Sequence, residues 1–107
     1  LRQENLPVQI DEYIREHLTD ALDAPSIAEH FGIGKTRLYE IAKESYGCGI
    51  AEHIRKERIE KAKALLLSDP ALPVSEIAVL SGFSDYNNFI TLFRKQTGFT
   101  PRQFRAL

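Results

Sequence analysis

The fold is decided by two short stretches of the chain, SIAEHFGIG at residues 26–34 and EIAVLSGFS at residues 76–84. The two stretches align at an offset of 50 residues. Beyond Ser84 the alignment continues at an offset of 51, which pairs Lys43 with Arg94 and Gly47 with Gly98. Self-similarity of this kind indicates a structural unit that is used twice. The 107-residue chain is therefore predicted to contain two copies of one motif.

The second copy has the pattern of a short helix, a tight turn and a longer helix. Pro73 introduces the short helix, Gly82 permits the positive φ of a sharp turn, and Ser84 is a good N-cap. The longer helix is predicted to begin near Asp85 and to end at Gly98. Apolar residues recur at helical spacing and are assigned to the core. They are Ile77, Phe83, Phe89, Leu92, Phe93 and, in a last short helix, Phe104.

The first copy repeats this pattern with weaker signals. Gly32 takes the place of Gly82 in the turn, and the second helix is predicted to end near Gly47. Gly34 stands where the second copy has its serine, so this helix lacks a side chain that could cap it. The residues assigned to the core here are Ile27, Ala28, Phe31, Leu38, Ile41 and Ala42.

Three further helices are predicted around the two copies. Pro7 opens a first helix, a continuous helix without proline or glycine runs from Ile50 to Leu67, and Thr100 caps a last helix that Pro101 begins. Eighteen residues at about 1.5 Å each make the middle helix roughly 27 Å long. No alternating strand pattern is present. The prediction is one all-α domain, residues 1–107, with about seven helices: a helix-turn-helix subdomain at 8–48, a connecting helix at 49–68 and a second subdomain at 73–107.

Composition restricts the classes of protein to be considered. The chain has 43% hydrophobic residues and no long apolar run, which predicts a cytoplasmic protein with no membrane partner. The single cysteine, Cys48, cannot form an internal disulfide. Three histidines far apart in the sequence, with no second ligand assigned at i+3 or i+4, predict no metal site, and no pattern suggests a cofactor or a catalytic group. The absence of methionine suggests a piece of a longer protein, with a further domain upstream.

The net charge of −1 hides an uneven distribution. Residues 1–33 hold two basic and seven acidic side chains, whereas residues 34–107 hold twelve basic and eight acidic ones. Asymmetry of this kind matters more for a polyanionic partner than the sum does. Charge alone leaves two readings open, namely a polyanion-binding surface and two differently solvated faces.

A helix-turn-helix unit with an exposed second helix is suited to reading DNA. Asparagine, threonine and tyrosine side chains on such a helix can reach base edges in the major groove, while flanking lysine and arginine residues contact phosphates. Two other readings remain open on this pattern: a helical bundle with a polar surface, and a module that binds other proteins.

The run GFSDYNNFITLFRKQTGFTPRQFR at residues 82–105 resembles the signature of the AraC/XylS family of bacterial transcription regulators, G-F-S-D-x-S-Y-F-x-R-x-F-K-x-x-x-G-x-T-P-x-x-Y-R. The resemblance extends over residues 8–105. It implies a domain that binds specific double-stranded DNA and regulates transcription, with its two second helices in successive major-groove segments. It also implies an upstream sensing or receiver domain and RNA polymerase as partners.

The resemblance assigns roles to individual residues. The base-reading residues are expected to be Lys35, Thr36, Tyr39 and Glu40 in the first unit, and Tyr86, Asn87, Asn88, Ile90 and Thr91 in the second. The phosphate contacts are expected from Arg37, Lys43, Arg94, Lys95 and Arg105. Asn87 is the best direct reader, since an amide pairs with N6 and N7 of adenine.

Four residues depart from the family pattern. Thr91 and Glu40 stand where the family commonly has arginine, so each reading helix lacks a strong contact to guanine. Glu40 either accepts a hydrogen bond from a cytosine amino group or pairs with Arg37, and pairing is favoured because helix neighbours three residues apart meet readily. Gly34 replaces a serine cap and Ala42 a core phenylalanine. The first unit is therefore predicted to be the looser and less selective one.

Overall fold

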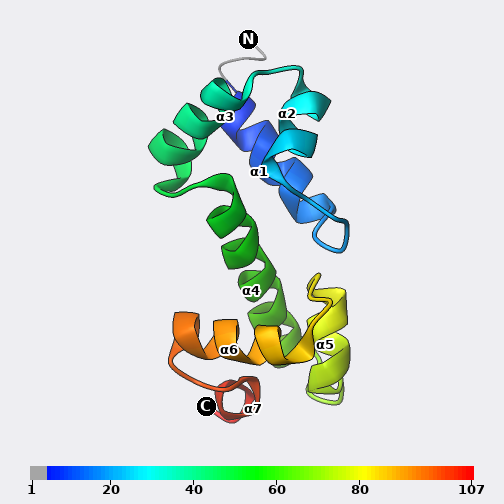
Figure 1. Ribbon diagram of the computed structural model, residues 1–107. Coiled ribbons are helices and arrows are strands. Elements are labelled where there is room, and N and C mark those ends of the chain that lie inside the picture. Colours follow the sequence, from blue (N-terminus) through cyan, green and yellow to red (C-terminus); the bar gives the residue numbers. More distant parts are fainter. Residues whose placement is uncertain (1–4) are drawn as a thin grey trace. The chain divides into compact units, whose positions relative to one another are not determined.

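The computed structural model describes residues 5–107, and throughout this range the chain forms helices joined by turns, with no β-strand (Figure 1). This confirms the prediction of an all-α fold with about seven helices. None of these helices is long and apolar enough to cross a membrane. The elements are α1 (Leu6–Glu16), α2 (Ala24–Phe31), α3 (Lys35–Ile41), a π-helical segment (Ala42–Tyr46), α4 (Ile50–Ser68), α5 (Val74–Leu80), α6 (Tyr86–Thr97) and α7 (Pro101–Arg105).

The chain divides into two compact units, and the division falls inside α4, between Glu57 and Arg58. Residues 49–68 are predicted from the sequence to form a connecting helix. In the structure each half of α4 also contributes buried residues to the core of one unit. In the first unit Ile50 and Ile54 of α4 pack with buried residues of α1, α2 and α3. In the second unit the buried cluster consists of Ile59, Ala62, Leu66, Ile77, Ala78, Phe83, Phe89 and Phe93.

The turn inside each unit has the same backbone geometry. Gly32 and Gly82 adopt φ values of 66° and 99°, a left-handed conformation that only glycine enters without strain. The amide after each glycine donates to an equivalent carbonyl: Ile33 to Ala28 at 3.0 Å, and Phe83 to Ala78 at 2.9 Å. These bonds satisfy carbonyls that the end of the short helix would otherwise leave unpaired. The internal repeat is therefore a repeat of hydrogen bonds as well as of residues.

The second helices of the two units begin differently. Gly34 precedes α3 and provides no side-chain cap, as predicted. In front of α6 the cap is Asp85, whose carboxylate accepts hydrogen bonds from the backbone N–H groups of Asn87 at 2.9 Å and Asn88 at 3.2 Å. The prediction of Ser84 as N-cap was wrong by one residue, because a carboxylate at position 85 reaches two amides at once.

The end of α3 contains a feature that the sequence did not predict. α3 passes directly into the π-helical segment, which ends at Gly47 with φ 76°. The expected end near Gly47 is confirmed, but the last turn is wider than an α-helical one. Lys43 lies in this turn, and its ammonium group lies 5.7 Å from the centre of the Tyr39 ring.

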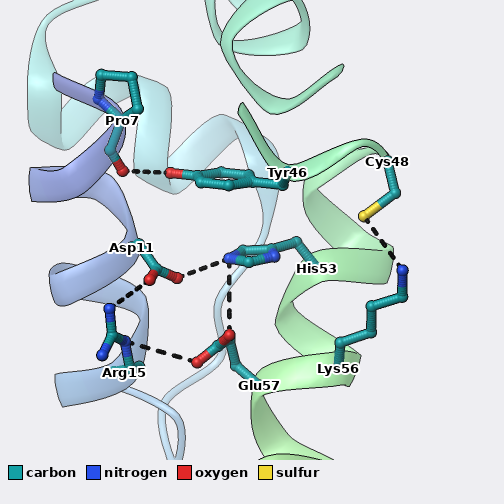
Figure 2. Close-up of polar contacts among 8 residues, drawn as sticks. All are labelled: Pro7, Asp11, Arg15, Tyr46, Cys48, His53, Lys56 and Glu57. Atoms are coloured by element: carbon teal, nitrogen blue, oxygen red, sulfur yellow. Dashed lines mark hydrogen bonds and ion pairs between the residues drawn. The ribbon is translucent and has the colours of Figure 1, made fainter. Parts of the chain in front are cut away.

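A polar network joins α1 to the first half of α4 within the first unit (Figure 2). His53 donates through Nε2 to Oδ1 of Asp11 at 2.6 Å. The guanidinium of Arg15 pairs with Asp11 and lies 3.6 Å from Oε1 of Glu57. The ring of Tyr46 stacks on His53 with centroids 3.9 Å apart, and its hydroxyl donates to the carbonyl of Pro7 at 2.5 Å. These contacts supplement the apolar core of the first unit.

Burial of the Tyr46 phenol, together with the negative charges of Asp11 and Glu57, raises its pKa to about 12 from its ordinary value of 10.0. The unfolded chain then loses this proton at lower pH than the folded chain, so the free energy of unfolding falls as pH rises from about 10 to about 12. Urea unfolding at pH 9 and pH 11 will measure the fall, which Tyr46→Phe should reduce. Tyr39→Phe, at an exposed ring, is the matched control. An unchanged fall in Tyr46→Phe would contradict this assignment.

The core of the second unit contains one polar side chain without a partner. Ser81 follows α5 at the turn and is fully buried, and its hydroxyl makes no hydrogen bond among the residues described. A buried hydroxyl that leaves water without gaining a partner opposes folding.

Replacing this hydroxyl should therefore stabilise the chain. We expect Ser81→Ala to raise the free energy of unfolding by about 1 kcal/mol, because alanine fills the site without an unsatisfied polar atom. Chemical denaturation followed by circular dichroism will measure the change. Ser84→Ala, at an exposed position outside the helices, should leave the unfolding free energy nearly unchanged. A loss of stability in Ser81→Ala would show that the hydroxyl is hydrogen-bonded in solution.

Candidate nucleic-acid interface

The outward face of α3 contains the four base-reading residues predicted in the first unit. Leu38 and Ile41 point into the core, and this orientation places the remaining side chains on the surface. All four predicted readers are exposed: Lys35, Thr36, Tyr39 and Glu40. The structure therefore gathers them on one helix face, where residues three and four apart are neighbours.

The favoured pairing of Glu40 with Arg37 does not form in the structure. Both side chains are exposed, and no ion pair or hydrogen bond joins them among the described residues. An exposed pair on a helix gains little Coulomb energy and must order two long side chains, so water competes successfully with it. The carboxylate of Glu40 thus remains available on the outward face of α3.

The outward face of α6 contains the predicted readers of the second unit. Phe89 and Phe93 are fully buried, which fixes the orientation of the helix. Tyr86, Asn87, Asn88 and Thr91 are exposed, and Ile90 is half-buried at the edge of the core. Asp85 holds the backbone of Asn87 and Asn88, whereas the Asn87 side-chain amide has no partner in the described part of the chain. This amide is therefore presented on a firmly capped helix end.

Two hollows border the exposed face of α6. The first lies beside the beginnings of α5 and α7, and the second runs along the last turns of α6. Ile90 and Thr91 line both. The first is also lined by Val74, Tyr86, Asn87, Thr100, Pro101 and Arg102, and the second by Arg94, Lys95 and Gly98. Their charged lining residues are all cations, so this surface is suited to a polyanion.

Among the residues predicted to contact phosphates, four lie on the surface and one does not extend freely into solvent. Arg37, Lys43, Arg94 and Lys95 are exposed. Arg105 instead donates to three backbone carbonyls at the end of α4 and in the loop after it: Leu66 at 3.2 Å, Asp69 at 3.2 Å and Leu72 at 2.8 Å. Its guanidinium completes hydrogen bonds that a helix end lacks, which is a structural role.

Arg102 is a candidate that the sequence prediction missed. It is exposed in the first turn of α7 and lines the same hollow as Asn87 and Thr91. The spacing of the signature could have indicated this residue, because it directly follows the Thr100-Pro101 start of α7. Arg102 and Arg105 lie three residues apart, yet they differ in the partners that the structure gives them.

One group of side chains has the composition of a metal site. Asp11, His53 and Glu57 offer ligand atoms within 4.8 Å of one another (Figure 2). Glu57 follows His53 by four residues, a spacing that the expectation of no metal site passed over. Arg15 already supplies positive charge to both carboxylates, so the structure accounts for this group as an ion-pair network.

The comparison with known proteins agrees with this geometry. A family model described as a helix-turn-helix domain matches residues 27–107. The arabinose operon regulatory protein of Salmonella typhimurium is 34% identical over 96 residues, which cover 89% of this chain and 34% of that protein. The chain thus spans about a third of the length of such relatives.

Solved structures share the arrangement of helices. The C-terminal domain of AraT, a response regulator from Geobacillus stearothermophilus, superposes with a TM-score of 0.85 at 33% identity, covering 94% of this chain and 83% of that one. The DNA-binding domain of AdpA, solved in complex with a target DNA, has a TM-score of 0.85 at 22% identity, covers 94% of this chain and 89% of that one, and supports the fold. The chain belongs to the AraC family of helix-turn-helix DNA-binding transcription regulators.

Proposed function

We propose that the chain recognises an operator by placing α3 and α6 in two successive major-groove segments of duplex DNA. The observation that carries this proposal is the exposed face of α6. There the Asn87 amide, which has no partner among the described residues, lines one of two neighbouring hollows whose charged lining residues are all cations. Base edges are read by side chains of this type, and phosphates are held by the cations around them.

The proposed roles follow the exposure of each side chain. Base readers are Lys35, Thr36, Tyr39 and Glu40 in α3, and Tyr86, Asn87, Asn88, Ile90 and Thr91 in α6. Phosphate contacts come from Arg37, Lys43, Arg94 and Lys95, and Arg102 takes the place that the sequence assigned to Arg105. Because Glu40 has no partner among residues 5–107, it can accept a hydrogen bond from the amino group of a cytosine.

Further partners follow from the size of the relatives. Since the matched relatives are about three times as long as the matched region, we propose that a sensing or receiver domain adjoins this domain in the complete protein. RNA polymerase is the proposed target of regulation, and the cytoplasm is the proposed location. The family is one of DNA-binding regulators rather than of enzymes.

The two reading helices can be compared by their effect on sequence selection. We expect Asn87→Ala to reduce the free-energy preference for one base at one position by about 1–3 kcal/mol, because it removes a bidentate amide contact. The reduction should be larger than that in Glu40→Ala. Selection from a random 30-base-pair duplex library, followed by fluorescence anisotropy with the enriched duplex, will measure both. Lys43→Ala is the control and should weaken binding to all sequences alike. A larger loss of discrimination in Glu40→Ala would contradict the proposed ranking.

Arg102 and Arg105 provide a matched pair for separating binding from stability. Arg102→Gln should reduce the slope of log K against log salt by about 0.9, the value for one phosphate contact, and leave unfolding unchanged. Arg105→Gln should instead lower the free energy of unfolding by about 2 kcal/mol, because three carbonyls lose a charged donor, and leave the slope unchanged. The reverse pattern would show that Arg105, rather than Arg102, contacts a phosphate. A flat salt dependence of the unsubstituted chain would favour a protein-binding module over DNA binding.

A further inference from the structure

We propose that the hollow beside the start of α6 is a subsite for thymine methyl groups, so that the second unit reads an A·T-containing step. The inference rests on the proposed function and specifies the bases that α6 selects. Its basis is the mixed lining of this hollow, which combines the amide of Asn87 with the half-buried apolar side chains of Val74 and Ile90.

The polar side of the subsite suits adenine. Asn87 is the second residue of α6, and Asp85 holds its backbone N–H at 2.9 Å, which leaves the side-chain amide to project from a fixed helix end. The NH2 group of the amide can donate to N7 of adenine while its oxygen accepts from the N6 amino group. The first eight residues of α6 include no lysine or arginine, and the first cation is Arg94. A bidentate contact to guanine is therefore absent from the first two turns.

The apolar side suits thymine. Ile90 and Thr91 follow Asn87 by three and four residues, so the three side chains occupy one face of the helix about 5–6 Å apart. Ile90 packs against the core of the second unit and also lines the hollow, and Thr91 is exposed with its own methyl group. In the major groove only thymine presents a methyl group, at C5. Base steps are about 3.4 Å apart along a strand, so the amide and the apolar patch would meet neighbouring or next-but-one base pairs.

The charge around the hollow favours this occupant over a peptide. Among the described residues that line it, none is acidic and the one charged residue is Arg102 of α7. A phosphate beside the thymine would pair with this guanidinium. Duplex DNA thus supplies both chemical groups that the subsite accommodates, a methyl group in the groove and an anion on the adjacent backbone.

The experiment removes the methyl group and leaves base pairing intact. The full chain first selects sites from a random 30-base-pair duplex library, and the half-site of α6 is identified as the one whose selection Asn87→Ala relaxes. Each thymine of that half-site is then replaced singly by deoxyuridine. We expect one replacement to weaken binding about three- to fivefold, the value of one buried methyl group. Replacements in the other half-site should have a smaller effect.

Variants of the protein test which side chains bind the methyl group. Ile90→Ala should bind the thymine and deoxyuridine duplexes equally. Thr91→Ser removes a methyl group at an exposed position and keeps the hydroxyl, so it should reduce the difference in affinity between the two duplexes without affecting folding. Val79→Ala, at an apolar side chain that is 65% exposed outside the hollow, should keep the full difference. Thermal unfolding followed by circular dichroism confirms that each variant folds.

The outcomes separate this inference from the proposed function. An α6 half-site made of G·C pairs, or deoxyuridine duplexes that bind as well as thymine duplexes, would overturn the methyl subsite and leave operator recognition standing. Failure to enrich any sequence, with binding independent of salt, would overturn the proposed function itself. Enrichment of A·T pairs together with a methyl effect that Ile90→Ala abolishes would establish both.

Discussion

The left-handed turn at Gly32 and Gly82 is the constraint on which the rest of each unit depends. A residue with a Cβ at φ 66° or 99° would be strained. Without this turn the last carbonyls of the short helix could not accept hydrogen bonds from the amides that follow. The turn directs the second helix back across the first, so that Leu38 in one unit and Phe89 in the other enter the core. Once these apolar stripes are buried, the polar side chains of α3 and α6 must lie on the surface. The exposure of the proposed base readers is thus a consequence of turn geometry.

The sequence predicted those parts of the structure that depend on local rules. Helical spacing of apolar residues located the buried faces, and Thr100 with Pro101 located the start of α7. The failures have separate physical causes. Ser84 and Asp85 are both good caps, and only the backbone decides which of them reaches the amides. The π-helical turn after Ile41 leaves no mark in the apolar pattern.

Long-range contacts were beyond the reach of pattern analysis. Arg105 bonds to carbonyls 33 to 39 residues away, and His53 bonds to Asp11 at a separation of 42 residues. The pairing expected between Arg37 and Glu40 rested on proximity along a helix, and proximity does not outweigh hydration of two exposed charges. The exposure of the proposed base readers was predictable because the helix faces were, whereas the partners of each charged side chain depend on tertiary structure.

The two units differ in how firmly their reading helices are held. α6 begins at a carboxylate that satisfies two amides, and its exposed face carries neither an acidic side chain nor, before Arg94, a basic one. α3 begins at an uncapped glycine, ends in a wider turn and exposes both an acidic side chain, Glu40, and a basic one, Lys35. Selection by hydrogen bonds requires side chains with fixed positions, since a mobile donor loses entropy on binding. The firmer cap of α6 supports the proposal that α6 selects its bases more strictly than α3 does.

The division of α4 between two cores restricts how such a chain can be shortened. Compact units are usually separated by a flexible segment with few contacts across it, whereas here the boundary lies between consecutive residues of one helix. A fragment that kept all of α4 with the first unit would expose Ile59, Ala62 and Leu66, and a fragment that ended at Glu57 would stop in the middle of a helix. Half of this chain, folded by itself, would therefore be a poor DNA-binding domain, and the two copies of the motif depend on the helix that they share.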